Sequence, residues 1–134
     1  MQRTILGRTG LNVSVMGLGG GGHSKLGTKT GRTEQESVRV VHEALDSGIN
    51  FIDTSEVYGT EEIVGRAIAG RTRDSVAIST KMGTWKQIGP DDAVSRLEGS
   101  LKRLGTDYID IYNFHGLHLD WYDHYIDHVY PALV

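Results

Sequence analysis

Short apolar runs alternate along this chain with segments in which apolar residues recur at helical spacing. Such alternation is typical of βα units built on a parallel sheet. Each apolar run is followed by a stretch that carries signals for the start and the end of a helix. The predicted strands occupy residues 15–18, 50–53, 75–80 and 108–114.

Two short β-prone runs precede this repeating part. Residues 3–6 and 12–15 lie on either side of the turn sequence Gly7-Arg-Thr-Gly10. A pair of such runs around a glycine-containing turn predicts a β-hairpin. We therefore expect an N-terminal hairpin that stands outside the βα repeat.

Capping signals mark the predicted helices. The segment Thr33-Glu-Gln-Glu36 has the form of a capping box, so the first helix is expected to begin there and to end at Gly48. The second helix carries its apolar face over residues 63–68. Pro90, with two aspartates after it, opens the third helix, which Gly105 ends.

Four βα units suit either a small doubly wound domain or part of a (β/α)₈ TIM barrel, and the pattern alone leaves both open. Length favours the barrel. A complete barrel of eight units takes about 250 residues, so four units in 134 residues correspond to half of one. No linker divides the chain. We therefore expect residues 1–134 to be the N-terminal portion of a single barrel domain, a half-barrel of about four βα units preceded by the hairpin.

Composition and charge narrow the function classes. No apolar run reaches the roughly 18–20 residues of a membrane span, so we expect a soluble protein with no membrane partner. The N-terminus lacks the layout of a signal peptide, which favours a cytoplasmic location. A net charge of −3 argues against a nucleic-acid partner. The chain has no cysteine, which excludes disulfides and thiolate metal sites.

Four ionisable residues follow the predicted strands. Asp53 ends the second strand, Lys81 the third and His115 the fourth, and Tyr58 lies in the loop after Asp53. Taken singly, each has a structural explanation. Asp53 would cap a turn or a helix, and Lys81 would be a solvated surface charge. His115 would be a hydrogen-bonded structural histidine, and Tyr58 an aromatic residue packed on the barrel rim. Reactive groups of parallel α/β proteins gather at the carboxyl ends of strands, however. Three successive strands that bring such groups to one end therefore favour a catalytic cluster.

Several motifs resemble those of the aldo-keto reductase family, in the family's order, from about residue 3 to about residue 116. The segment Gly48 to Gly59 (GINFIDTSEVYG) resembles the signature around the catalytic Asp and Tyr. Residues 79–82 (STKM) resemble the catalytic-lysine strand, and residues 100–115 (SLKRLGTDYIDIYNFH) resemble the segment that ends in the catalytic His. Residues 6–19 resemble the N-terminal hairpin and first strand.

The resemblance implies an enzyme that reduces aldehydes or ketones to alcohols by hydride transfer from NADPH. Tyr58 would be the general acid that protonates the carbonyl oxygen. Free tyrosine ionises only near pH ~10, so a nearby cation is needed, and Lys81 would supply it. Asp53 would hold Lys81 in place, and His115 would hydrogen-bond and orient the substrate oxygen. The partner implied is a small-molecule carbonyl compound, and no metal is required.

The cofactor contacts implied within this chain are few. Gly19, Gly20, Gly21 and Asp53 would meet the nicotinamide end of NADPH (NADP⁺). In the family most adenosine and phosphate contacts come from the last strands of the barrel, where barrel phosphate sites generally lie. We therefore expect the isolated 134-residue chain to be inactive.

Other interpretations stay open beside this one. A regulatory or binding subunit of the same fold, as in potassium-channel β subunits, would keep the same catalytic residues. An inactive half-barrel fragment would self-associate, since its first and last strands have unpaired edges. The sequence alone does not distinguish either of these two classes from an active enzyme.

Three patterns favour competing sites weakly. The sequence Gly17-Leu-Gly-Gly-Gly-Gly22 satisfies G-x-G-x-x-G, but no helix is expected directly after it, as a Rossmann site would need. His124 and His128 have the i, i+4 spacing of a zinc pair, without the catalytic Glu of H-E-x-x-H. Aromatic residues at 121–125 would line a substrate pocket, although packing is the commoner role.

Overall fold

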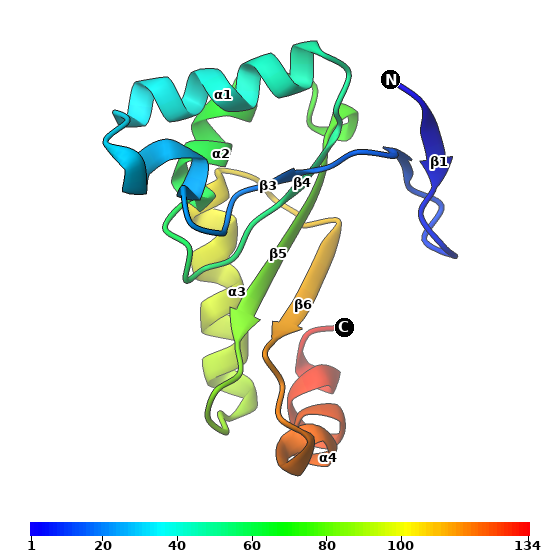
Figure 1. Cartoon of the computed structure of the whole chain (residues 1–134). Coiled ribbons are helices and arrows are strands. Elements are labelled where there is room, and N and C mark those ends of the chain that lie inside the picture. The colour runs from blue at the N-terminus through cyan, green and yellow to red at the C-terminus, as the bar shows by residue number, and fades with distance from the viewer.

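A parallel four-stranded sheet forms the centre of the computed structural model, which describes residues 1–134 (Figure 1). Its strands lie in the order β3-β4-β5-β6, so each pairs with the next strand along the chain. A doubly wound sheet reverses its strand order at a switch point, whereas a barrel adds strands in sequence. The observed order is that of a partial barrel. The strands are β3 (Leu18–Gly19), β4 (Phe51–Asp53), β5 (Ala77–Gly83) and β6 (Ile111–His115).

The N-terminal hairpin is present as predicted. Strands β1 (Arg3–Ile5) and β2 (Asn12–Ser14) pair antiparallel, with Thr4 opposite Val13. In Figure 1 the hairpin projects away from α2 and α3. Asn50, which directly precedes β4, fastens it: its side chain accepts from the Ser14 N–H at 2.6 Å and donates to the Asn12 carbonyl at 3.0 Å.

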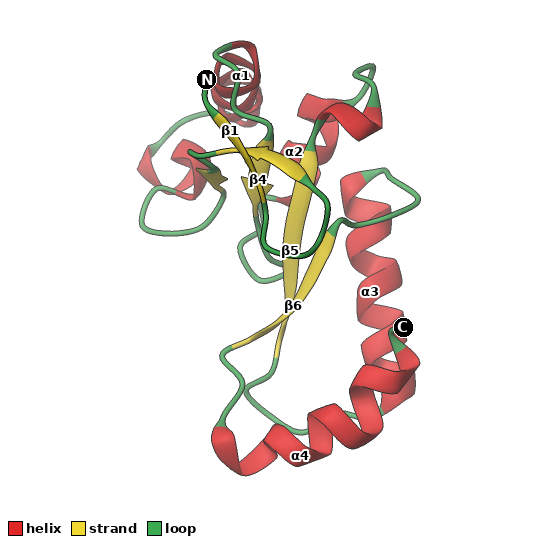
Figure 2. Cartoon of the chain, turned by 90° about the vertical axis from the view of Figure 1, so that its right-hand side faces the viewer, coloured by secondary structure: helices red, strands yellow, loops and turns green.

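The three predicted helices are confirmed as α1 (Glu34–Asp46), α2 (Glu61–Ile68) and α3 (Pro90–Leu104). At the start of α1 the Thr33 hydroxyl accepts from the Glu36 N–H, and the Glu36 carboxylate accepts from the Thr33 N–H, which completes the capping box. Gly105 ends α3 with a left-handed φ of 63°. Figure 2 shows α3 running alongside β5 and β6.

Two apolar clusters hold these layers together. The larger lies between the sheet and the helices and contains Leu26, Val41, Ile52, Ile63, Val64, Ala67, Ile68, Val76, Ile78 and Leu104. The smaller lies toward the carboxyl ends of the strands and contains Met82, Ile88, Ala93, Tyr125 and Val129. All four apolar residues predicted for the face of α2 belong to the larger cluster. The clusters thus fix the strand ends at which the candidate residues lie.

The first sheet strand is shorter than predicted. Residues 15–17 lie outside the ladder, and β3 keeps only two residues. The Val15 N–H donates to the Gln2 carbonyl at 3.0 Å, and the Ser14 hydroxyl donates to the Met16 carbonyl at 2.6 Å. Because the hairpin engages this segment, it cannot pair with β4, and Val15 is left 57% exposed.

The last two strands begin later than predicted. β5 starts at Ala77 and continues to Gly83, so Lys81 lies within the strand and not at its end. β6 starts at Ile111, three residues after the predicted start. The Arg73 guanidinium explains the later start of β6, because it donates to the Tyr108 carbonyl and to the Asp110 carboxylate and holds this segment outside the ladder.

Irregular helical turns follow β6. They run through Leu119–Trp121, α4 (Tyr122–His124), a wider turn at Tyr125–Val129 and Tyr130–Ala132. His124 and His128 therefore lie on an irregular helical segment. No helix in the structure combines the length and the apolar character needed to cross a bilayer.

Candidate active site

Asp53 and Lys81 form an ion pair across neighbouring strands. The Lys81 ammonium lies 2.6 Å from both carboxylate oxygens of Asp53 and 2.7 Å from the Thr54 carbonyl. The Lys81 side chain is 15% exposed, whereas that of Asp53 is 42% exposed. Parallel pairing sets the closeness, because Asp53 is in register with Ser79, two residues before Lys81 on the same face of β5. The structure thus brings together two residues that the sequence placed 28 positions apart.

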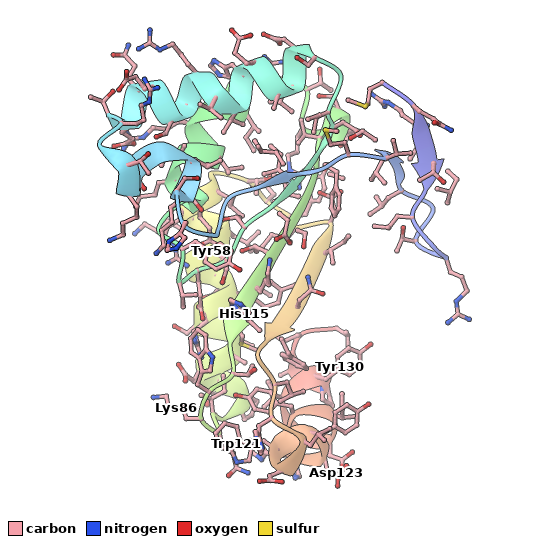
Figure 3. The ribbon with its side chains drawn as sticks, in the orientation of Figure 1. Tyr58, Lys86, His115, Trp121, Asp123 and Tyr130 are labelled. Atoms are coloured by element: carbon pink, nitrogen blue, oxygen red, sulfur yellow. The ribbon has the colours of Figure 1, made fainter.

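Tyr58 and His115 meet beside this ion pair. The Tyr58 hydroxyl lies 3.5 Å from His115 Nε2, and the two rings are perpendicular with centroids 5.5 Å apart. The Lys81 ammonium lies 5.4 Å from the centroid of the Tyr58 ring. In Figure 3 Tyr58 and His115 lie near one another in the middle of the molecule. All four residues predicted from the sequence therefore form one cluster.

Further hydrogen bonds fix the carboxylate of this cluster. The Ser79 hydroxyl donates to Asp53 Oδ1 at 2.9 Å, and the Asn113 amide donates to the Ser79 hydroxyl at 3.1 Å. Three strands thus contribute to the placement of Asp53. A carboxylate that accepts from a cation and a hydroxyl is oriented before any ligand arrives.

The predicted cofactor glycines lie at the edge of the same cluster. Gly19 ends β3 in register with Asp53, and the Gly20 N–H donates to the Asp53 carbonyl at 2.7 Å. A Cβ on Gly21 would lie 2.6 Å from the Tyr58 ring, and one on Gly20 would lie 2.8 Å from the Thr60 hydroxyl. Gly20 and Gly21 therefore allow the first loop to pack against the loop of Tyr58. A Cβ on Gly19 would meet no atom within 4 Å, so the backbone there is open to a ligand.

Glu56 is a residue of the site that sequence reasoning did not select. Its carboxylate accepts from the Gly83 N–H at 2.6 Å and pairs with the Arg96 guanidinium of α3. The Glu56 side chain is only 10% exposed. It ties the loop that carries Tyr58 to β5 and to a helix. The only signal in the sequence is the position of Glu56 within the GINFIDTSEVYG motif, which says nothing of a partner 40 residues away.

Trp85 is a second residue that the sequence reasoning missed. Its ring centroid lies 5.5 Å from that of His115, and 57% of Trp85 is exposed. The ring packs over Gly83, where a Cβ would lie 2.2 Å from it, and beside Gly116. Trp85 thus forms an exposed apolar wall next to the imidazole.

Two residues that follow β6, His124 and Tyr125, lie within hydrogen-bond distance of backbone carbonyls in the loop after β5. Tyr125 is fully buried and donates to the Lys86 carbonyl at 2.6 Å, and burial raises the pKa of its hydroxyl. Tyr125 therefore belongs to the core and not to a substrate pocket. His124 Nε2 lies 2.8 Å from the Ile88 carbonyl, and its ring contacts that of His128.

The glycine-rich segment does not form a Rossmann site. A helical turn at Lys25–Thr30 with left-handed residues inside it follows the glycines, and α1 begins only at Glu34. No α-helix N-terminus therefore meets the glycine loop, as pyrophosphate binding of that type requires.

Comparisons with known proteins agree on one family. The family model described as "Aldo/keto reductase family" matches residues 16–134. The aldo-keto reductase YhdN of Bacillus subtilis (strain 168) is 41% identical over 128 residues, which cover 86% of this chain and 38% of that protein.

Solved structures show the same likeness. The aldo-keto reductase AKR11C1 from Bacillus halodurans (holo form) superposes with a TM-score of 0.80 at 33% identity, over 98% of this chain and 45% of that one. The Bombyx mori aldo-keto reductase in complex with NADP gives a TM-score of 0.65 at 34% identity, over 83% and 36%. The chain spans about two fifths of the length of the curated relatives it matches.

Proposed function

Because the chain belongs to the aldo/keto reductase family, we propose that the barrel to which residues 1–134 contribute reduces aldehydes or ketones to alcohols, with NADPH as the hydride donor. The family and its oxidoreductase relatives support the reaction class. The close arrangement of Asp53, Lys81, Tyr58 and His115 supports the mechanism.

Tyr58 is the proposed general acid. Its hydroxyl and His115 Nε2 are 3.5 Å apart, so a carbonyl oxygen next to one is within reach of the other. Proton donation leaves a phenolate, which a positive charge stabilises. Lys81 provides that charge 5.4 Å from the ring centroid, and Asp53 keeps the ammonium in place. This geometry is the observation that carries the proposal.

The residues present fit only the nicotinamide end of the cofactor. Gly19 offers open backbone beside Asp53, whose carboxylate remains 42% exposed. When bound, NADPH supplies the hydride that attacks the carbonyl carbon. Among the structural neighbours, the Bombyx mori enzyme is in complex with NADP, which supports the choice of this cofactor. The proposed partner is a small carbonyl compound, with Trp85 as an apolar wall for it.

The test is Tyr58→Phe in a barrel-length protein that contains this chain. We expect reduction of an aromatic aldehyde to fall by roughly 10²–10⁴-fold, the usual contribution of a general acid, while NADPH binding measured by fluorescence titration is unchanged. Tyr122→Phe is the matched control, because Tyr122 is 50% exposed and lies outside the cluster. Turnover of Tyr58→Phe at the wild-type rate would refute the role of Tyr58.

A further inference from the structure

Ser55 is the centre of a small hydrogen-bond network and has no assigned part in the proposed reduction. The residue is fully buried, between Asp53 and Tyr58 in the loop after β4. Its hydroxyl oxygen lies 3.2 Å from His115 Nδ1, 3.0 Å from the Lys81 carbonyl oxygen and 3.5 Å from the Val57 nitrogen. One hydroxyl therefore contacts the imidazole on the side opposite to Tyr58.

The hydrogen count of this network has one consistent solution. A serine hydroxyl has one hydrogen to donate and two lone pairs to accept with. The Val57 N–H can only donate, and the Lys81 carbonyl can only accept. If the hydroxyl donated to the imidazole instead, its oxygen would face the Lys81 carbonyl oxygen at 3.0 Å with no hydrogen between them. The hydrogen therefore goes to Lys81, and the remaining lone pair faces Nδ1 of His115.

We propose that Ser55 is a positioning residue that holds neutral His115 in the Nδ1–H tautomer, in which Nδ1 donates to the Ser55 hydroxyl. The tautomer of a histidine is set by the hydrogen bond that its other nitrogen makes. His115 Nε2 is then left with a lone pair that faces the Tyr58 hydroxyl, and the phenol donates to it. Contacts with Tyr58 and Trp85 on the ring keep the imidazole in this orientation.

This assignment changes what His115 does for a bound carbonyl compound, a consequence that rests on the proposed function. A neutral imidazole with its hydrogen on Nδ1 cannot donate to the substrate oxygen from Nε2. Tyr58 is then the only donor of the pair, and His115 becomes a second donor only when both of its nitrogens are protonated. The tautomer itself is a property of the free protein and stands independently of the reaction.

The experiment is a long-range ¹H–¹⁵N correlation spectrum of the full chain carrying ¹⁵N-histidine, recorded near pH 8.5, where an ordinary imidazole with a pKa of about 6.5 is neutral. The pattern of correlations distinguishes the two tautomers of His115. We expect the Nδ1–H form to predominate. In Ser55→Ala the ratio should shift toward Nε2–H by roughly 2- to 10-fold, the change that corresponds to loss of one hydrogen bond.

Two further variants separate positioning from general destabilisation. Ser55→Thr retains the hydroxyl and should restore the Nδ1–H form. Ser37→Ala removes an equally buried hydroxyl of α1, which donates to the carbonyl of the capping residue Thr33, and should leave the His115 ratio unchanged. A predominant Nε2–H form in the unsubstituted chain would overturn the proposal, even if Ser55→Ala failed to fold. So would an unchanged ratio in a folded Ser55→Ala. Neither result depends on turnover, so each is distinct from failure of the proposed reaction.

Discussion

At the scale of single residues, Lys81 depends on Asp53 for its one ion pair. Replacing Asp53 by Asn leaves the ammonium, which is only 15% exposed, with the Thr54 carbonyl and a neutral amide. A fully buried pair broken in this way costs about 3–5 kcal/mol and an exposed pair about 1 kcal/mol or less. Since the Asp53 side chain is 42% exposed, we expect Asp53→Asn to lower the free energy of unfolding by about 1–2 kcal/mol.

Urea denaturation measures this difference. Asp46→Asn is the control, because Asp46 pairs with Arg71 at 2.7 Å but is 62% exposed. The control should cost under about 0.5 kcal/mol. Equal losses in the two variants would contradict a special role of Asp53 in holding Lys81.

The Tyr112 hydroxyl makes the stability of the folded protein depend on pH. Burial raises the pKa of its hydroxyl above the ordinary value of about 10, and the nearby Glu56 carboxylate adds to the rise. The hydroxyl is buried and has no hydrogen-bond partner in good geometry, although Ser100 offsets a little of the shift. The folded state holds this proton more tightly than the unfolded state. The contribution of Tyr112 to the free energy of unfolding is therefore fully present below about pH 10 and is lost as the pH rises above it.

We therefore expect Tyr112→Phe to make unfolding less sensitive to alkaline pH. The wild-type protein should lose up to about 1.4 kcal/mol per pH unit above pH 10 through this group, and the variant should lack that part of the loss. Urea denaturation at several values between pH 8 and about pH 11 measures it. Tyr122→Phe, at a 50% exposed tyrosine, should behave like the wild type, and identical slopes in all three proteins would disprove the assignment.

The cluster of Asp53, Tyr58, Lys81 and His115 was predictable from the sequence because its members are chemically distinctive and lie in or just after successive strands. Asp53, Lys81 and His115 needed only the rule that strand ends converge, and the motif around Tyr58 supplied the fourth member. Their partners were not predictable in this way. Ser55 and Arg96 acquire their roles only through distances that depend on strand register and helix packing.

At the scale of whole elements, local signals placed the helices better than the strands. The capping box at Thr33 and the glycine at 105 act within one helical turn, so the sequence contains the whole signal. The starts of β3 and β6 depend instead on distant groups. The Gln2 carbonyl engages Val15, and the Arg73 guanidinium holds residues 108–110 out of the sheet.

The contact between α2 and α3 supplies a prediction at this scale. A Cβ at Gly65 of α2 would lie 2.7 Å from the carbonyl oxygens of Arg103 and Leu104 in α3. These are backbone atoms, so the helices themselves would have to separate. We expect Gly65→Ala to lower the free energy of unfolding by about 1–3 kcal/mol, as overpacking does, despite the better helix propensity of alanine.

Gly99→Ala in α3 is the matched control for that substitution. Its Cβ would meet only the Nη1 end of the Arg103 side chain, at 3.1 Å, which needs to shift by only a few tenths of an ångström. Helix propensity then dominates, and we expect a gain of about 0.5–1 kcal/mol. Opposite signs for the two variants in thermal or urea denaturation would support close packing of α2 on α3, whereas a gain at both sites would refute it.

At the scale of the whole molecule, the sheet is open at β3 and at β6. An apolar groove lies beside β6, between α3 and the C-terminal helical turns. Leu97 and Leu101 of α3 line this groove and are only partly buried. Side chains from the C-terminal turns complete it: Ile126, Tyr130, Leu133 and Val134. A strand edge next to an apolar surface is a site at which another chain pairs.

We therefore predict that a polypeptide of these 134 residues alone self-associates, with a second copy covering the β6 edge and the groove. Ile126→Asp places a charge on the groove and should weaken association by at least about tenfold, or roughly 1.4 kcal/mol. Ile5→Asp, at a 55% exposed position in the hairpin, is the control and should leave association unchanged. Sedimentation velocity over a range of concentrations measures both variants. A compact monomer at every concentration would contradict the prediction, since the open edge and the uncovered leucines would then be stable in water without a partner.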